Sequence, residues 1–373
     1  MYQGIGNICY GVGSGLGGVF GGSMNDRWGW RSAFHFQLPF IALSTILVAF
    51  TVQVPVKETD KSRIKRVDFL GGITLVIALV LLLLGLNSGG NIVPWTHPLV
   101  LTTLPLSAIL LCVFVCIEDQ VAAEPIIPVR LVINRTVLSA CLTNWFITMS
   151  AYGVLYYVPI YFQIRGFSPT RAGAQLIPNS IGGALGSLGA GLIMRWTGRY
   201  YYLNLGIEST VVLAYVLISI FFRDHLAVWP PFIILFLAGF GYGSMLTLTL
   251  IALISGVDHS QQAVITSASY AFRSTGATIG ITIASVVFQN VLKSELWARF
   301  GNEPNAEKII RALRDSIDEI NRVPASWRSG VFESYIHAIE GVWLAILGTG
   351  AVGAVISLSM REYKLHNTLD RSK

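Results

Sequence analysis

Long runs of apolar residues recur along the chain and are separated by short polar segments. A bilayer core about 30 Å thick needs about 20 apolar residues per helix. The runs are continuous rather than alternating, which favours helices over the strands of a barrel, because a helix satisfies its own backbone groups in lipid. The pattern predicts about ten membrane-spanning helices, at residues 1–24, 32–54, 68–86, 98–117, 138–164, 171–194, 201–222, 230–254, 264–292 and 340–360.

The longest polar stretch covers residues 293–339. After Pro304, apolar residues recur within it at helical spacing. This spacing predicts an amphipathic helix that lies on the membrane surface or caps the helix bundle, with a solvated helix as the alternative. Its apolar positions are Ile309, Ile310, Leu313, Ile317 and Ile320.

The composition agrees with an all-α polytopic membrane protein. Of the 373 residues, 53% are hydrophobic and 12% are charged, whereas soluble domains carry about 25% charged residues. This composition excludes a water-soluble fold and a disordered chain. The four cysteines form no CxxC pattern and no cluster with histidine, so neither a disulfide framework nor a zinc site is indicated.

Basic residues concentrate in one set of alternate loops. The net charge of +6 therefore indicates basic loops rather than a nucleic-acid partner. The positive-inside rule predicts that this set is cytoplasmic, although the loop 293–339 adds basic residues to the opposite side. The cytoplasmic set comprises residues 55–67, 118–137, 195–200, 255–263 and 361–373.

Glycines recur along the first predicted span, where small residues let helices approach closely. Simple helix packing is one interpretation. The spacing of Gly4, Gly13, Gly17, Gly21 and Gly22 also resembles the antiporter motif of the major facilitator superfamily, found in the fifth helix of its drug:proton antiporters. Gly18 stands where that motif has proline.

Further segments resemble the fourteen-span group of this superfamily, in the same order along the chain. They are Trp30-Arg31 through Gln37-Leu38-Pro39, Asp68-Phe69-Leu70-Gly71, Glu124-Pro125-Ile126-Ile127-Pro128, Tyr156 through Gln163, and Gly166-Phe167-Ser168-Pro169. Gln37 and the first span are similar to the fungal vacuolar basic amino acid transporters.

The resemblance implies a partial major facilitator fold in which the first run is helix five, so that the N-terminal four helices are missing. Residues 1–54 would be a two-helix remnant of the N-terminal half. Residues 55–137 would be a central helix pair with cytoplasmic loops. Residues 138–373 would form a complete C-terminal six-helix half with the non-cytoplasmic loop 293–339.

The implied function is proton-coupled secondary transport of basic amino acids or drugs across a vacuolar or plasma membrane, with substrate bound between the two halves. The alternative is a truncated, non-transporting relative that acts as a binding or partner subunit. The implied partners are the lipid bilayer, a small-molecule substrate and protons, without nucleic acid or cofactor. No phosphate-loop, HExxH or GxSxG pattern supports an enzyme.

Candidate pathway residues are polar groups inside the spans. Glu208 and Arg273 lie deep in theirs, where charges are expensive and usually functional, and snorkelling to the surface is the alternative. Along the fifth run, Asn144, Tyr152, Tyr156 and Gln163 partly share a helix face that suits a cationic or amphipathic substrate. A tyrosine belt at the membrane interface is the alternative. Asp26 and Arg31 end the first span as conformational or anchoring residues.

Overall fold

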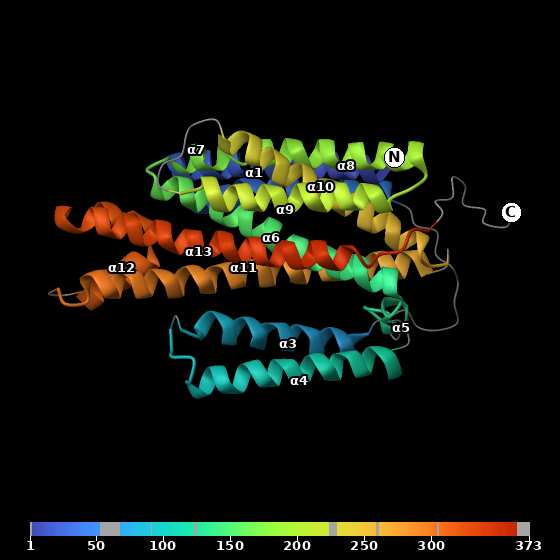
Figure 1. The fold of residues 1–373 in the computed structure, drawn as a ribbon, viewed down its shortest axis with the longest axis horizontal. Coiled ribbons are helices and arrows are strands. Elements are labelled where there is room, and N and C mark those ends of the chain that lie inside the picture. Colours follow the sequence, from blue (N-terminus) through green and yellow to red (C-terminus); the bar gives the residue numbers. More distant parts are fainter. Residues whose placement is uncertain are drawn as a thin grey trace.

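The computed structural model describes residues 2–52, 68–90, 92–122, 125–223, 230–258, 261–303 and 306–363. Across these residues the chain is helical and contains no strand, apart from one isolated bridge between Gly89 and Val93. The long helices alternate in direction along one common axis (Figure 1). The helices are α1 Tyr2–Trp28, α2 Trp30–Thr51, α3 Phe69–Ser88, α4 Pro98–Gln120, α5 Val129–Val132, α6 Arg135–Ile164, α7 Pro169–Ala174, α8 Ile177–Thr197, α9 Tyr201–Phe221, α10 Pro230–Ser255, α11 Gln262–Phe300, α12 Ala306–Asp315 and α13 Ala325–Ser357, with a 3₁₀ turn at Ile317–Asn321.

Nine of the described helices are long and apolar enough to cross a membrane, with α7 and α8 counted as one span. They correspond to the second through tenth predicted runs, so the chain is a multi-pass membrane protein. The first predicted span is helix α1, whose 27 residues give it a length of about 40 Å. It is not among the nine, because its many glycines and polar residues dilute the apolar side chains.

The predicted loop 293–339 is largely helical, which corrects that expectation. Helix α11 continues to Phe300 and α13 begins at Ala325. The two extensions stay helical because they pack on each other: the rings of Phe300 and Trp327 stack 4.3 Å apart. Only residues 301–324 lie between the two long helices.

The predicted amphipathic helix is confirmed as α12. Ile310 and Leu313 are buried, and the Tyr335 hydroxyl of α13 donates to the Leu313 carbonyl oxygen. The apolar side of α12 is therefore covered by the protein, as expected for a cap on the bundle.

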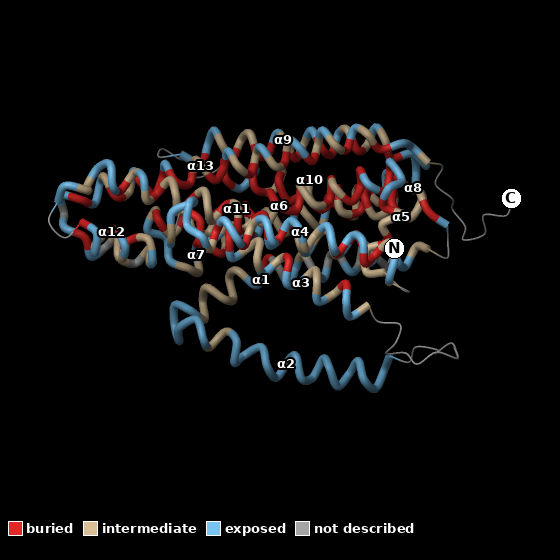
Figure 2. Tube along the Cα trace, turned by 90° about the horizontal axis from the view of Figure 1, so that it is seen from below, coloured by how far each residue is buried: buried red, intermediate tan, exposed pale blue. Residues whose placement is uncertain are grey.

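Helices α6, α8, α9, α10, α11 and α13 enclose the main core (Figure 2). Helices α8 and α10 approach most closely because glycines line their contact. A Cβ atom on Gly182 would meet the Phe236 carbonyl, and one on Gly243 would meet the Gly183 carbonyl. Only glycine permits backbones at this distance.

Two helix pairs lie outside this core. Helix α1 packs along α7 and α8, while α2 contacts α1 and contains no buried residue (Figure 2). Helices α3 and α4, here called the central helix pair, pack together beside α11 (Figure 1). Lys293 Nζ donates to the Gly90 carbonyl oxygen at 3.0 Å and ties this pair to α11. The apolar residues on the outer surfaces suit contact with lipid.

Candidate functional site

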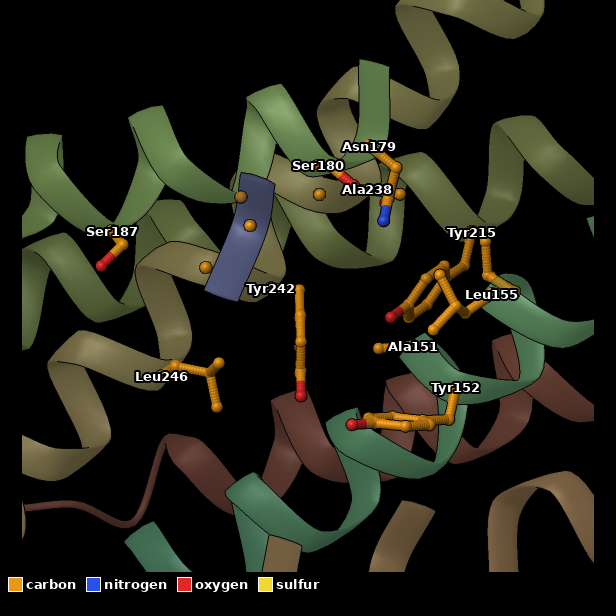
Figure 3. A pocket seen from close by; sticks show the side chains of 15 residues that line it. Ala151, Tyr152, Leu155, Asn179, Ser180, Ser187, Tyr215, Ala238, Tyr242 and Leu246 are labelled. Carbon is orange, nitrogen blue, oxygen red and sulfur yellow. The ribbon is translucent and has the colours of Figure 1, made fainter. Parts of the chain in front are cut away.

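A pocket of about 60 Å³ lies inside the bundle among α1, α6, α8, α9 and α10. Three tyrosines surround it: Tyr152 from α6, Tyr215 from α9 and Tyr242 from α10. Their rings converge on one space, and the side chain of Asn179 reaches toward it from the start of α8 (Figure 3). The volume accommodates a few water molecules, so a larger ligand does not fit this arrangement of the helices.

The pocket exists where close helix packing meets large aromatic side chains. Gly183, Gly239 and Gly243 line its wall on α8 and α10, where their lack of side chains lets the two helix backbones come together. Gly11 contributes from α1. Aromatic rings with phenol groups beside an amide provide cation–π contacts and hydrogen bonds together.

Glu208 lies on the same side of α9 as Tyr215, which follows it by seven residues or two helical turns. Glu208 is 3% exposed, and among the described residues neither carboxyl oxygen has a hydrogen-bond partner. Tyr215 lines the pocket together with Tyr242, whereas Glu208 is not among the lining residues. The Tyr215 hydroxyl also has no hydrogen-bond partner in the described part of the chain. Because the Glu208 side chain is buried inside the bundle, snorkelling to the surface is excluded.

The four residues predicted on α6 do not meet in one site. Asn144 is buried and its amide donates to Ser269 Oγ of α11 at 3.0 Å. Tyr156 is 51% exposed on the outer surface, and Gln163 is half-buried near the end of α6. Of these four residues, only Tyr152 lines the pocket.

Arg273 is half-buried on α11. Its guanidinium carbon lies 6.0 Å from the ring centre of Tyr270, one turn earlier on the same helix. It does not line the tyrosine pocket.

The structure divides the predicted glycines of α1 between two faces. A Cβ atom on Gly22 would lie 2.6 Å from the Thr170 Cα atom, so α1 touches α7 there. Gly13, Gly17 and Gly21 have no neighbour within 4 Å of such an atom. The surroundings of Gly4 lie outside the described residues.

The glycines that pack against α7 and α8 include Gly11 and Gly15, which the motif interpretation missed, and Gly18, which it placed at the motif's proline position. A Cβ atom would lie 3.3 Å from the Ser180 carbonyl oxygen at Gly11 and 3.0 Å from the Gly173 carbonyl oxygen at Gly18. At Gly15 it would lie 2.9 Å from the Ser180 Cβ atom. The signal was present in the sequence, because positions 11, 15, 18 and 22 repeat at helical spacing.

The ends of the first helix pair hold Asp26 and Arg31. Asp26 Oδ2 accepts a hydrogen bond from the Thr170 backbone N–H at 3.2 Å and another from the Thr170 hydroxyl. The Arg31 guanidinium lies 4.3 Å from the ring centre of Trp30. Asp26 therefore links α1 to α7, whereas Arg31 makes a local contact.

Sequence reasoning missed Tyr215, Tyr242 and Asn179. Tyr215 is recognisable only through its spacing from Glu208, and the other two lie on helices that the sequence does not place beside α6. Among the described residues, no group of three or more His, Cys, Asp or Glu side chains could hold a metal ion.

Comparison with known proteins shows the family of this chain. The family model described as Major Facilitator Superfamily matches residues 1–281. The chain belongs to the major facilitator superfamily, as the motif series indicates.

Several of its relatives come from fungi. The chain is 36% identical to "Multidrug resistance protein fnx1" of Schizosaccharomyces pombe, over 100% of this chain and 71% of that protein. It is 32% identical to "Vacuolar membrane amino acid uptake transporter fnx2" of the same yeast, over 92% of this chain and 60% of that protein. It is 29% identical to "Vacuolar basic amino acid transporter 1" of Saccharomyces cerevisiae, over 100% of this chain and 71% of that protein. The chain thus spans between three fifths and three quarters of the length of these relatives.

Proposed function

We propose that this chain acts as a proton-coupled secondary transporter of small organic cations, with basic amino acids or drug-like cations as substrates. The observation that carries the proposal is the tyrosine pocket together with the buried carboxyl group of Glu208, two helical turns before Tyr215 on α9. Family membership and the transporter names of the relatives support the same class.

The pocket supports a cationic substrate. The faces of aromatic rings attract cations, and this attraction strengthens away from bulk water. The rings of Tyr152, Tyr215 and Tyr242 and the amide of Asn179 come from different helices. Small relative movements of α6, α8 and α10 would therefore enlarge the space for a substrate larger than water.

Glu208 is our proposed proton site. A buried ionised carboxylate costs several kcal/mol unless it is paired, and Glu208 has no hydrogen-bond partner among the described residues. It exchanges a proton at lower cost when movement of the helices brings water or a substrate cation near it. Tyr215 lines the pocket and lies on the same side of α9 as Glu208, so a movement of α9 would act on both.

The vacuolar membrane is the location that we propose, because two relatives carry vacuolar in their names. The alternative of a non-transporting subunit finds no support among the named relatives.

Transport by purified protein in liposomes tests the proposal. Uptake of radiolabelled lysine, and of ethidium in a parallel assay, is measured with and without an imposed pH gradient. We expect the gradient to stimulate uptake of at least one of them. Equal uptake in both conditions would refute proton coupling.

The variant Glu208→Gln separates coupling from binding. We expect it to lose gradient-driven uptake down to the level of empty liposomes, while exchange of labelled for unlabelled substrate continues, because exchange needs no net proton movement. Ser209→Ala, whose side chain is exposed on the next position of α9, is the matched control and should behave as the wild type. Full gradient-driven uptake in Glu208→Gln would remove Glu208 from the mechanism.

A further inference from the structure

Two acidic side chains meet at the end of the central helix pair that lies beside α5. Asp68 precedes α3, and its Oδ1 atom accepts a hydrogen bond from the Gly71 backbone N–H at 2.8 Å. Glu118 lies in the last turn of α4 and is 3% exposed. Its Oε2 atom accepts a hydrogen bond from the Ile127 backbone N–H at 3.1 Å.

Each carboxyl group keeps one buried oxygen without a donor. Within the described chain, neither Asp68 Oδ2 nor Glu118 Oε1 has a hydrogen-bond partner. Both of these oxygens lie beside the same point of α3, at Gly71. Gly71 makes this approach possible, because a Cβ atom there would contact Asp68 Oδ2 and would lie 3.1 Å from Glu118 Oε1.

Among the described residues, no basic side chain forms an ion pair with either carboxyl group. Asp119, next to Glu118, pairs with Arg130 through an Nε–Oδ1 distance of 2.9 Å. That ion pair is exposed and uses the one basic residue of α5. Within the described part of the chain, the ion pairs of α4 and α5 therefore leave Asp68 and Glu118 unpaired.

We infer that Asp68 and Glu118 form a proton-binding site in which two carboxyl groups share one proton. Two carboxylates so close cannot both ionise without strong repulsion. With one proton, one group donates and the other accepts, and a hydrogen bond to an ionised carboxylate is roughly twice as strong as a neutral one. The backbone N–H groups of Gly71 and Ile127 stabilise the single remaining negative charge.

A metal ion fits the site less well than a proton. Divalent cations take several oxygen ligands, and no cluster of three or more acidic, histidine or cysteine side chains occurs among the described residues. The proton would hold together the start of α3, the end of α4 and the segment that leads to α5. This site lies on the central helix pair, apart from Glu208 on α9, so it does not depend on the proposed transport function.

Infrared difference spectroscopy of the full chain in lipid nanodiscs at neutral pH tests this inference. A protonated carboxylic acid gives a carbonyl band that shifts in deuterated water. An ionised carboxylate does not give this band. We expect Asp68→Asn and Glu118→Gln each to lose the band of one carboxylic acid. Each variant leaves a single carboxylate that accepts from the new amide and needs no proton.

Asp119→Asn is the matched control, because this neighbouring carboxylate is already paired with Arg130. It should keep the whole band, and all variants should elute as the wild type does in size-exclusion chromatography. Retention of the band in Asp68→Asn would show that Glu118 holds the proton alone and would overturn sharing. A band unchanged in both variants, or one that appears only after Mg²⁺ is removed, would overturn the proton site itself.

Discussion

At the residue scale, polar side chains inside the spans divide into two groups. Asn144 and Asn204 donate to Ser269 and Ser357 on neighbouring helices, at 3.0 and 3.1 Å. Glu208 instead has unpartnered carboxyl oxygens among the described residues. The first group stabilises the packing of the helices through hydrogen bonds between them, and this role is sufficient to explain its presence. The missing partners of Glu208 require another explanation, which proton binding provides.

The hydrogen bond of Asn144 predicts a structural role for this residue. We expect Asn144→Ala to lower the free energy of unfolding by about 0.6 kcal/mol and by no more than about 1.7 kcal/mol, the mean and the maximum measured for such bonds between membrane helices. Affinity for lysine or ethidium should stay the same, because the Asn144 amide faces α11 rather than the pocket.

Thermal unfolding in detergent and equilibrium binding measure the two effects. Tyr242→Phe is the complementary variant: it removes a pocket hydroxyl and should weaken binding more than it lowers stability. A loss of affinity in Asn144→Ala equal to that in Tyr242→Phe would contradict the structural role and return Asn144 to the substrate pathway.

At the element scale, α1 has one packed and one open glycine face. The packed face comprises Gly11, Gly15, Gly18 and Gly22, against α7 and α8. The open face comprises Gly13, Gly17 and Gly21. The glycines of the antiporter-like motif are thus divided between a contact that the structure shows and a face with free space.

Adjacent glycines on these two faces give a matched pair of variants. We expect Gly22→Ala to destabilise the protein by about 1–3 kcal/mol, the usual cost of overpacking, because the new methyl group meets the α7 backbone. Gly21→Ala should be neutral or stabilising by up to about 1 kcal/mol, because alanine favours the helix and space is free.

Thermal unfolding of both variants checks this prediction. Disulfide formation between cysteines introduced on α1 and α7 would report, in each variant, whether the two helices stay in contact. Equal destabilisation by Gly21→Ala and Gly22→Ala would contradict the assignment of the two faces.

Most of the helices were predicted correctly from the sequence. The second through tenth runs became membrane-length helices, and Ile310 and Leu313 marked the buried side of α12. The long extensions of α11 and α13 were not predicted, since polar residues such as Arg299 and Glu333 look like loop residues until their ion pair is seen.

At the scale of the whole molecule, the alternating helices place the predicted cytoplasmic loops together. The end that holds α5 also holds the α8–α9 connection and residues 358–363, whereas α7 and α12 lie at the opposite end (Figure 1). The positive-inside rule makes the α5 end cytoplasmic, which remains a prediction about orientation.

Glycosylation tests this orientation. Asn134 precedes Arg135 and Thr136 in an acceptor pattern, and its side chain accepts from the Thr136 N–H at the start of α6. We expect no glycan at Asn134 after expression in yeast. The substitution Pro304→Thr creates an acceptor at Asn302 near the α12 end, where a glycan should appear.

Mass shifts on gels before and after enzymatic deglycosylation read out both sites. A glycan at Asn134 together with none at Asn302 would invert the topology. The double variant Asn302→Gln/Pro304→Thr is the control for the new site.

The sequence by itself determined the number and position of the apolar runs, the membrane class and the family resemblance. These depend on hydropathy and residue order within a segment, because each segment enters the lipid bilayer according to its own hydropathy. Only the tertiary structure decided which glycine face of α1 packs, that Glu208 is buried beyond the reach of snorkelling, and that Tyr152 shares a pocket with Tyr215 and Tyr242. Helices that are distant in the chain supply these contacts, so their geometry depends on how whole helices pack rather than on any one segment.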